Sequence, residues 1–186
     1  MKRLLVVVDY QRDFVDGALG FDGAEKLEGP IMDKIVEYRA TGNDVAFTLD
    51  THHQNYLQTQ EGKNLPIVHC IEGSPGQALY GRVADARKDI DSVYYKSSFG
   101  SPEFFVRLLQ AQKVAGGMGK QPFESIEFVG LVSNLCVLSN AVLAKTACPE
   151  VPIIVDAACT GAPDEEMNEK ALDIMEALQI KVINRD

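Results

Sequence analysis

Cys136 is the residue whose type and setting point most directly to chemistry. It lies in the stretch Gly130–Ala141, which follows the short apolar run Ser125–Val129 and continues into residues rich in Ala, Leu and Val. This pattern predicts a strand, a turn and a helix, with the thiol near the amino end of the helix. Unpaired N–H groups and the helix dipole at such an end lower the pKa of a thiol and favour the nucleophilic thiolate. The alternative is a buried structural cysteine, since free Cys is among the most buried residue types.

Two charged residues follow other apolar runs. Asp9 comes directly after Arg3–Val8, and Lys96 comes directly after Val93-Tyr94-Tyr95. Asp9 could act as a base if the apolar strand before it desolvates its carboxylate, and the alternative is a cap for the following turn. Lys96 would stabilise a thiolate if it lies beside Cys136, or keep a carboxylate ionised if it lies beside Asp9.

A third group of polar residues has the composition of a metal site. Asp50 and His52 follow the apolar run Asp44–Leu49, and one residue separates them, so they point the same way if strand pairing continues. Carboxylate and imidazole together suit Zn, Mn, Fe or Ni. The alternative is that Asp50 caps a turn and the histidines are solvated loop residues. The apolar approach Leu65–Val68 argues against simple solvation of His69.

Strand-like and helix-like segments alternate along the chain. The strands are predicted at Arg3–Val8, Asp44–Leu49, Ser92–Tyr95, Ser125–Val129, Pro152–Val155 and Ile180–Ile183, and the helices at Glu28–Thr41, Pro102–Val114, Val137–Lys145 and Asp164–Leu178. This alternation predicts one α/β domain over residues 1–186, a doubly wound three-layer sandwich with a mostly parallel six-stranded sheet. Ligands bind beyond the carboxyl ends of such strands, so we expect the four polar residues that follow strands to meet at one edge. The long connection Thr51–Asp91 is expected to be functional too.

Composition disfavours several classes of partner. The formal net charge is -9 and no Lys/Arg-rich run is present, which argues against nucleic-acid or anionic-membrane binding. The apolar run near the amino terminus is too short for a signal sequence, and no segment approaches the length of a membrane span. The four cysteines lack paired spacing, so we expect reduced thiols in a cytoplasmic protein. We also expect a homo-oligomer, whose subunit number the sequence does not define.

Taken together, the motifs resemble a known superfamily. Three stretches in the right order resemble the isochorismatase-like cysteine hydrolases: Asp9–Phe14, Lys96–Phe99 and Gly130–Val137. Within that superfamily, Asp50–His52, His69-Cys70 and Gly73–Gly76 resemble the nicotinamidase branch. The likeness covers nearly the whole chain and implies the α/β fold predicted above.

The resemblance implies a role for each catalytic candidate. Cys136 would attack a carboxamide carbon to form a thioester acyl-enzyme, Asp9 would serve as general base and acid, and Lys96 would stabilise the charged states. The family also has a cis peptide before the cysteine turn, which here falls at Leu131–Val132. It turns the N–H of Val132 toward that of Cys136, and the two N–H groups form an oxyanion hole.

The resemblance also implies a divalent metal, with Zn expected first and Fe or Mn as alternatives. The matching ligand positions are Asp50, His52 and His69. We expect Glu61 as the fourth ligand, with Gln58 or His53 as alternatives. In the family this metal orients the ring nitrogen of the substrate and waters, and it does not activate the nucleophile.

Two departures concern the substrate. Many nicotinamidases have an aromatic residue where this chain has Leu65, and one extra residue separates Pro66 from His69. A wall for a pyridine ring would then come from other aromatic residues. The predicted substrate pocket is Phe14, Leu65, Tyr95 and Phe99.

The sequence therefore predicts hydrolysis of a small primary amide, with conversion of nicotinamide to nicotinate and ammonia as the first candidate. One alternative is an amidase for an N-carbamoyl or ureido substrate, with the metal site empty or structural. Another is a non-catalytic relative that binds metal or ligand on the same fold.

Overall fold

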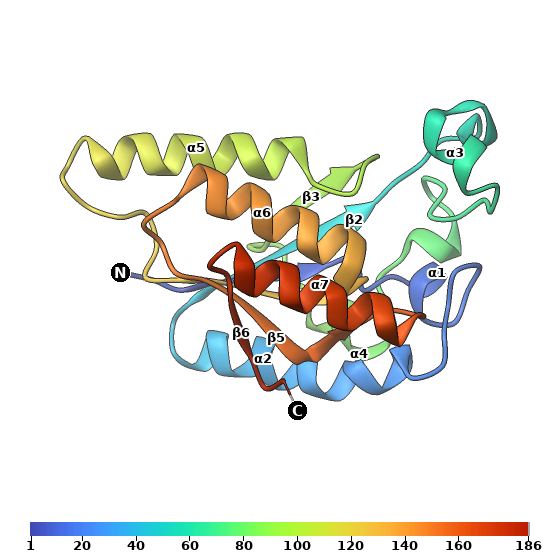
Figure 1. Ribbon diagram of the computed structural model, residues 1–186, viewed down its shortest axis with the longest axis horizontal. Coiled ribbons are helices and arrows are strands. Elements are labelled where there is room, and N and C mark those ends of the chain that lie inside the picture. The colour runs from blue at the N-terminus through green and yellow to red at the C-terminus, as the bar shows by residue number, and fades with distance from the viewer. Residues whose placement is uncertain (186) are drawn as a thin grey trace.

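The computed structural model describes residues 1–185, so Asp186, the last residue of the predicted domain, lies outside the described residues. Its centre is a six-stranded sheet of order β3-β2-β1-β4-β5-β6 in which every pair of neighbours is parallel (Figure 1). The strands are β1 Leu4–Val8, β2 Asp44–Asp50, β3 Ser92–Lys96, β4 Ile126–Leu131, β5 Ile153–Gly161 and β6 Lys181–Ile183. The predicted α/β fold is confirmed, and the sheet is wholly parallel.

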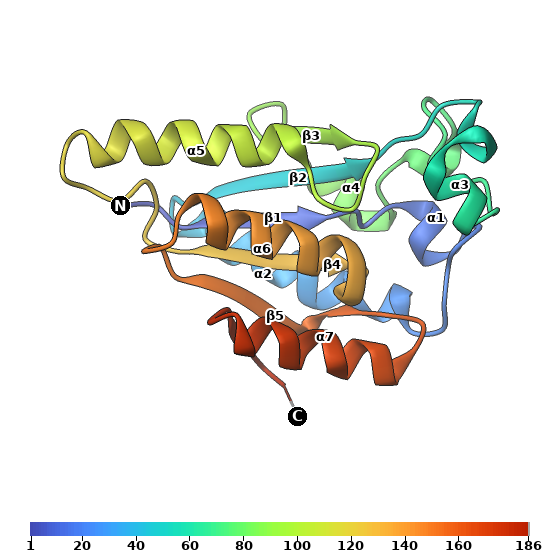
Figure 2. The same ribbon diagram turned by 45° about the horizontal axis from the view of Figure 1, so that its top comes forward.

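Helices cover both faces of the sheet. The α-helices are α1 Arg12–Val15, α2 Glu28–Ala40, α3 Gln60–Asn64, α4 Gly81–Ala86, α5 Pro102–Gly116, α6 Leu138–Ala147 and α7 Glu165–Ala177. Helices α5, α6 and α7 lie on one face, while α2 and α4 lie on the other (Figures 1 and 2). Short 3₁₀ turns occur at η1 Ala24–Leu27, η2 Tyr56–Gln58 and η3 Pro75–Gln77. None of the helices in residues 1–185 is long and apolar enough to cross a bilayer.

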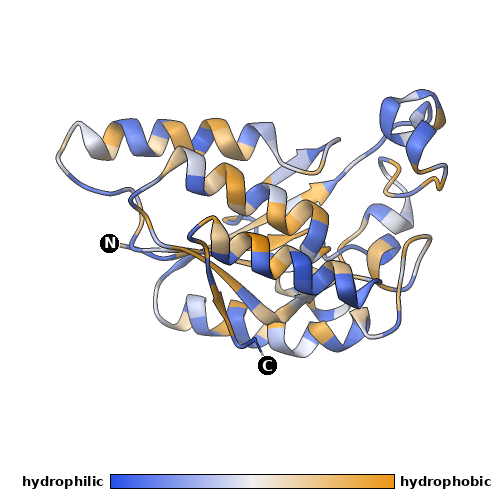
Figure 3. Ribbon diagram, in the orientation of Figure 1, coloured by the Kyte–Doolittle hydropathy of each residue, from blue (hydrophilic) through white to orange (hydrophobic). Residues whose placement is uncertain are grey.

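The apolar pattern of β1 explains its central position. Leu4, Val6 and Val8 pack into the cluster under α5, α6 and α7, whereas Leu5 and Val7 pack into the cluster under α2 and α4. A strand with both faces buried must be apolar at every position, as the unbroken run predicts. Hydrophobic residues accordingly concentrate on the inner strands, and the helices carry polar outer faces (Figure 3).

Strand β5 differs most from its prediction. It continues to Gly161, well beyond the predicted end at Val155, and its register against β4 shifts between Phe128 and Gly130. Apolar periodicity could not reveal this extension, because the strand continues through the buried carboxylate Asp156.

Chain order reverses between β1 and β4, since β2 and β3 follow on one side of β1 while β4, β5 and β6 follow on the other. In open parallel sheets a ligand site lies beyond the carboxyl ends of the strands at such a switch point. Here those ends point toward α1 and α3 (Figure 2). The long segment between β2 and β3 supplies α3 and α4, and α3 lies off the end of β2.

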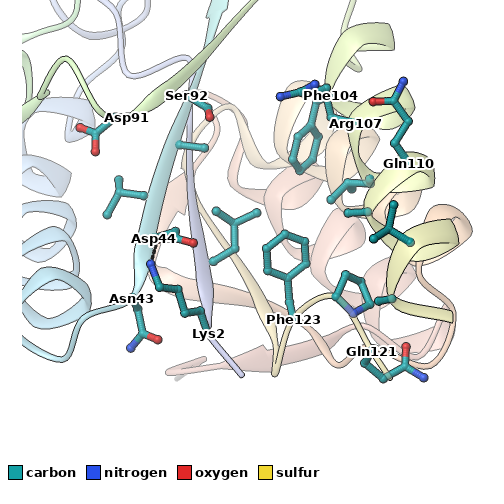
Figure 4. Close-up of a pocket in the computed structure, with 18 of the residues that line it drawn as sticks. Lys2, Asn43, Asp44, Asp91, Ser92, Phe104, Arg107, Gln110, Gln121 and Phe123 are labelled. Atoms are coloured by element: carbon teal, nitrogen blue, oxygen red, sulfur yellow. Dashed lines mark hydrogen bonds and ion pairs between the residues drawn. The ribbon is translucent and has the colours of Figure 1, made fainter. Parts of the chain in front are cut away.

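A groove of about 950 Å³ lies at the opposite, amino end of the sheet, between α5 and the first residues of β1, β2 and β3 (Figure 4). Phe104 and Phe123 project into it, and Lys2 and Asp44 form an ion pair of 2.6 Å on its rim. None of the residues predicted to do chemistry lines this groove.

Candidate active site and metal centre

Four chain segments deliver polar residues to the carboxyl edge of the sheet. Asp9 follows β1, Asp50 ends β2, Lys96 ends β3, and Cys136 follows β4. Asp50 and Lys96 are direct register partners across β2 and β3. The structure therefore brings together the residues that the sequence placed at one edge.

Cys136, Lys96 and Asp9 form one buried cluster. The Nζ of Lys96 lies 2.6 Å from Oδ2 of Asp9 and 3.4 Å from Sγ of Cys136. Thr48, inside β2, donates its hydroxyl hydrogen to Oδ1 of Asp9 at 2.7 Å. All four side chains are buried, with Cys136 only 5% exposed. A thiol, a carboxylate and an ammonium group thus meet at Lys96 in a site that excludes most water, and these are groups that could serve as nucleophile, base and cation.

The pKa of Cys136 differs from the expectation based on its sequence. Burial, followed by the negative charge of Asp9, raises the pKa of this thiol well above its usual value, although Lys96 opposes the change. The sequence pattern revealed the turn and the lysine, but it could not reveal complete burial next to a carboxylate. The resting thiol therefore keeps its proton.

Charges inside the cluster stabilise one another. Burial raises the pKa of Asp9, while Lys96 opposes that change. Burial alone would lower the pKa of Lys96, but Asp9, Cys136 and Asp50 outweigh it and raise that pKa. Lys96 therefore stays a cation inside the site.

The turn that carries Cys136 has an unusual backbone. Gly130 has a φ of +108°, and a Cβ there would collide with the carbonyl oxygen of Val8, so both backbone conformation and close packing require glycine. The Leu131–Val132 peptide is cis, at the position that the resemblance implied. A π-helical turn, η4 Ser133–Val137, then precedes α6. Cys136 lies in this turn and not in the first turn of a regular α-helix.

Beside this cluster, a second set of side chains converges on one point. Oδ2 of Asp50 lies 3.0 Å from Nε2 of His52 and 3.3 Å from Nε2 of His69. Oε1 of Glu61, on α3, lies 3.5 Å and 3.7 Å from the same two nitrogens. The ligand atoms of Asp50, His52 and His69 all lie within 4.8 Å of one another.

The donor set fits a divalent cation. His52 Nε2 is buried and makes no hydrogen bond to the described residues, although it faces two carboxylates. His69 uses its other nitrogen, Nδ1, to contact the carbonyl oxygen of Ile67 at 2.7 Å, which leaves Nε2 for a metal. Burial would raise the pKa of Asp50, but His52, His69 and Lys96 outweigh it and lower that pKa. Two imidazoles and an ionised carboxylate are ligands that Zn, Fe and Mn accept.

The alternative fourth ligands lie away from this cluster. His53 is exposed and contacts Glu72 at 3.3 Å, and Gln58 is exposed in η2. Glu61 is therefore the candidate fourth ligand that the structure brings to the histidines.

Of the four predicted substrate-pocket residues, Phe14 lies beside the metal cluster, whereas Tyr95 and Phe99 are exposed to solvent. Phe14 is buried and packs edge-on against the ring of His69, with centroids 5.6 Å apart. Leu65 contributes its carbonyl oxygen, which accepts the hydroxyl hydrogen of Tyr56 at 2.9 Å. Tyr95 and Phe99 are 58% and 43% exposed. Because Tyr95 precedes Lys96 on β3, its side chain projects from the opposite face of the strand.

Several supporting residues escaped the sequence analysis. Gln11 is fully buried and binds both backbone groups of Asp50: Nε2 donates to its carbonyl oxygen at 2.9 Å, and Oε1 accepts its N–H at 2.7 Å. The ring of Tyr56 packs against His52 and His69, with centroids 4.6 Å and 5.0 Å away. The available signal was a polar residue within an apolar strand, as with Thr48, or shortly after one, as with Gln11, which lies three residues beyond the end of β1.

Comparison with known proteins shows which family has this sequence. The family model described as the isochorismatase domain matches residues 3–186. The chain belongs to the isochorismatase family. One similar protein is the nicotinamidase/pyrazinamidase of Mycobacterium tuberculosis (strain ATCC 25618 / H37Rv). Its sequence is 24% identical to this chain over 185 residues, and the match covers 93% of this chain and 98% of that protein.

Solved structures confirm the isochorismatase-like fold. The pyrazinamidase of Pyrococcus horikoshii, a structure in complex with zinc, has a TM-score of 0.78 at 22% identity and covers 100% of both chains. The N-carbamoylsarcosine amidase of Thermoplasma acidophilum has a TM-score of 0.76 at 23% identity and covers 98% of this chain and 95% of its own. At these identities the likeness establishes the fold.

Proposed function

We propose that this member of the isochorismatase family is a metal-containing cysteine amidohydrolase, with nicotinamide as its substrate and nicotinate and ammonia as its products. The observation that carries the proposal is the buried contact of Lys96 with both Cys136 and Asp9, directly beside the Asp50, His52 and His69 cluster. The nicotinamidase/pyrazinamidase relative and the zinc-containing structural neighbour support it.

Acylation begins with the thiol of Cys136. Asp9 takes the thiol proton while Sγ attacks the amide carbon, so no free thiolate is needed in the resting site. The oxyanion that forms accepts hydrogen bonds from the N–H groups of Val132 and Cys136. Asp9 then gives its proton to the departing nitrogen, the C–N bond breaks, and ammonia leaves behind a thioester on Sγ.

Deacylation uses the same groups in reverse. Asp9 takes a proton from a water molecule, and the water oxygen attacks the thioester carbon. The C–S bond breaks, Sγ recovers its proton from Asp9, and the acid leaves. Lys96 stabilises negative charge as it moves between Asp9 and Cys136, because it is buried and contacts both.

Asp50, His52, His69 and Glu61 would hold the divalent cation. When bound, the cation would supply a Lewis-acidic contact that orients a pyridine nitrogen. Asp50 also connects the two halves of the site, since its Oδ1 lies 3.4 Å from Nζ of Lys96 while its Oδ2 faces the histidines. Phe14 provides an apolar edge next to His69.

An amide panel tests the substrate. Purified protein is supplied with Zn²⁺, Fe²⁺ or Mn²⁺ and assayed for ammonia release from nicotinamide, pyrazinamide, benzamide and N-carbamoylsarcosine. We expect nicotinamide and pyrazinamide to be hydrolysed faster than the other two. Ammonia from none of the four would contradict the proposed function.

The second candidate is an amidase for N-carbamoyl substrates. Leu65 and the exposed positions of Tyr95 and Phe99 favour it, since they leave Phe14 as the one predicted aromatic wall at the metal cluster. The fold shared with N-carbamoylsarcosine amidase is compatible with it. Preferential ammonia release from N-carbamoylsarcosine would select this candidate.

A further inference from the structure

Asn140 is a buried amide one helical turn beyond the nucleophile. It lies on α6, is 0% exposed, and makes three hydrogen bonds. Its Nδ2 donates to the carbonyl oxygen of Cys136 at 2.8 Å and to that of Phe99 at 3.1 Å. Its Oδ1 accepts the N–H of Ser101 at 2.9 Å.

These three bonds join two segments that are remote in sequence. Cys136 belongs to the π-helical turn after β4, while Phe99 and Ser101 belong to the loop that directly follows Lys96. Ser101 also caps α5, because its hydroxyl oxygen accepts the N–H of Phe104 at 3.2 Å. One side chain therefore connects the backbone of the nucleophile to the segment that carries the cation and to the start of the next helix.

The bond from Asn140 to Cys136 supports an irregular piece of backbone, the π-helical turn. In it, the N–H of Val137 donates to the carbonyl oxygen of Val132, five residues earlier. The amide of Asn140 binds the carbonyl oxygen of Cys136 and so holds the turn at the residue that carries Sγ. Without it, the buried carbonyl oxygen of Cys136, the partly buried carbonyl oxygen of Phe99 and the buried N–H of Ser101 would lose these bonds. A shift of the loop would then let water reach them.

We propose that Asn140 is a positioning residue for the nucleophile: it sets the contact between Cys136 Sγ and Lys96 Nζ, which is 3.4 Å in this structure. Its catalytic consequence rests on the function proposed above. A misplacement of about 1 Å between reacting groups costs on the order of 10²-fold in rate, so a small shift of the loop would be measurable.

Two substitutions separate the parts of this connection. Asn140→Leu retains similar bulk and removes all three hydrogen bonds. Asn140→Thr retains one, because a Thr hydroxyl in a helix can donate to the carbonyl four residues earlier, which here is that of Cys136. It loses the bonds to Phe99 and Ser101.

The matched control is Tyr38→Phe on the opposite face of the sheet. Tyr38 is also fully buried, and the substitution removes the bond of its hydroxyl to Oε2 of Glu127 (2.6 Å). We expect all three variants to lower the thermal midpoint. Asn140→Leu should reduce kcat by about 10- to 100-fold with KM within about twofold, Asn140→Thr by less, and Tyr38→Phe should leave kcat unchanged.

Alkylation of Cys136 provides a readout that needs no amide substrate. The rate of its labelling by iodoacetamide, followed by peptide mass spectrometry, should fall about tenfold in Asn140→Leu and remain at the wild-type value in Tyr38→Phe. If wild-type protein hydrolyses no amide in the panel, the proposed function fails while this labelling still tests the positioning role.

A folded Asn140→Leu variant with wild-type kcat and labelling rate would overturn the proposal and leave Asn140 as a stabilising residue only. If Asn140→Leu does not fold, Asn140→Thr decides. Labelling of Cys136 slower than in Tyr38→Phe supports the proposal, and labelling at the wild-type rate contradicts it.

Discussion

Lys96 is the side chain through which the two halves of the site meet. Its Nζ contacts Oδ2 of Asp9, and it lies 3.4 Å from both Sγ of Cys136 and Oδ1 of Asp50. Solvent does not screen these contacts, because the side chain is buried. Removing this one charge leaves two carboxylates without their shared cation.

Asp9→Asn and Lys96→Ala should each lower kcat by about 10³-fold or more, since each removes one member of a unit that transfers a single proton. The double variant should be scarcely worse than either single variant. Steady-state ammonia release measures the effect, and Lys88→Ala, at an exposed position, is the control. Losses that simply multiply in the double variant would mean that the residues act independently.

Cys136 should be the first of the four thiols to react with limiting iodoacetamide. Its Sγ lies beside Lys96 Nζ, and a neighbouring base can take its proton. Burial raises the pKa of all four thiols, and Cys70, Cys148 and Cys159 are at most 2% exposed, so the expected difference comes from the base and the cation beside Cys136. Peptide mapping after brief labelling checks the order, and label appearing first on Cys70 or Cys148 would rule out the assignment.

At this scale the sequence predicted positions better than environments. Asp9, Asp50 and Lys96 could be placed because each polar residue ends an apolar run, and parallel strands align their ends. The raised pKa of Cys136 depends on burial beside Asp9, which spacing alone did not resolve. The direction of Tyr95, by contrast, follows from its place next to Lys96 on β3 and was predictable from the alternation of side chains along a strand.

At the scale of elements, a buried ion network joins α2 to the sheet. The Nζ of Lys34 lies 2.7 Å from both Oε1 of Glu127 on β4 and Oδ2 of Asp156 on β5. Both carboxylates are nearly inaccessible to solvent, while the Lys34 side chain is 19% exposed. The hydroxyl of Tyr38 donates a further bond to Glu127. These contacts hold α2 against β4, which leads into the turn that carries Cys136, and against β5, which follows α6.

Lys34→Met should lower the free energy of unfolding by about 3 kcal/mol, because it leaves two buried carboxylates without their cation. Urea denaturation measures the loss. The control is Lys170→Met, which breaks an exposed pair with Glu166 and should cost less than about 1 kcal/mol. Equal losses in the two variants would mean that the Lys34 network contributes no more than a surface pair.

The candidate metal cluster combines residues from β2, α3 and the loops that follow them. Asp50 ends β2, Glu61 lies on α3, and His69 lies in the loop after α3. We expect His52→Ala to lower zinc content far more than Glu61→Gln, since Glu61 lies farther from the other ligand atoms. Chelation should reduce activity without unfolding, because a core of this size does not require a metal to fold.

Elemental analysis of purified and reconstituted protein tests that expectation, with His53→Ala as the control because His53 is exposed away from the cluster. Protein that binds no divalent metal after reconstitution would contradict it.

The order of strands and helices was predictable from alternating apolar runs. The π-helical turn and the extension of β5 were not, because both depend on backbone packing and buried polar pairs.

At the scale of the whole molecule, both halves of the site lie at the switch in strand order, and the large groove lies at the other end of the sheet. Because the two sites are apart, we expect substitutions at the carboxyl edge of the sheet, and not in the groove, to change the preference between substrates. If the metal cluster holds a ring nitrogen, nicotinamide should be hydrolysed with a higher kcat/KM than benzamide, since a site built for a polar atom discriminates against an analogue that lacks it.

His52→Ala should erase that preference, because it removes a metal ligand. Arg107→Ala, in the groove, should leave the preference unchanged. Competition assays with both amides measure the ratio. Equal hydrolysis of the two amides by wild-type protein would indicate a different acyl group.

The chemical assignment of Cys136 is tested most directly by ammonia release from the best amide in the panel, measured for wild-type protein and for Cys136→Ala. The variant should fold as wild type does, since it removes one sulfur atom at the edge of the core. We predict that the variant releases no ammonia above background with any of the metals supplied, while wild-type protein hydrolyses many molecules of the amide per active site. A folded Cys136→Ala variant that still releases ammonia would contradict the thioester mechanism.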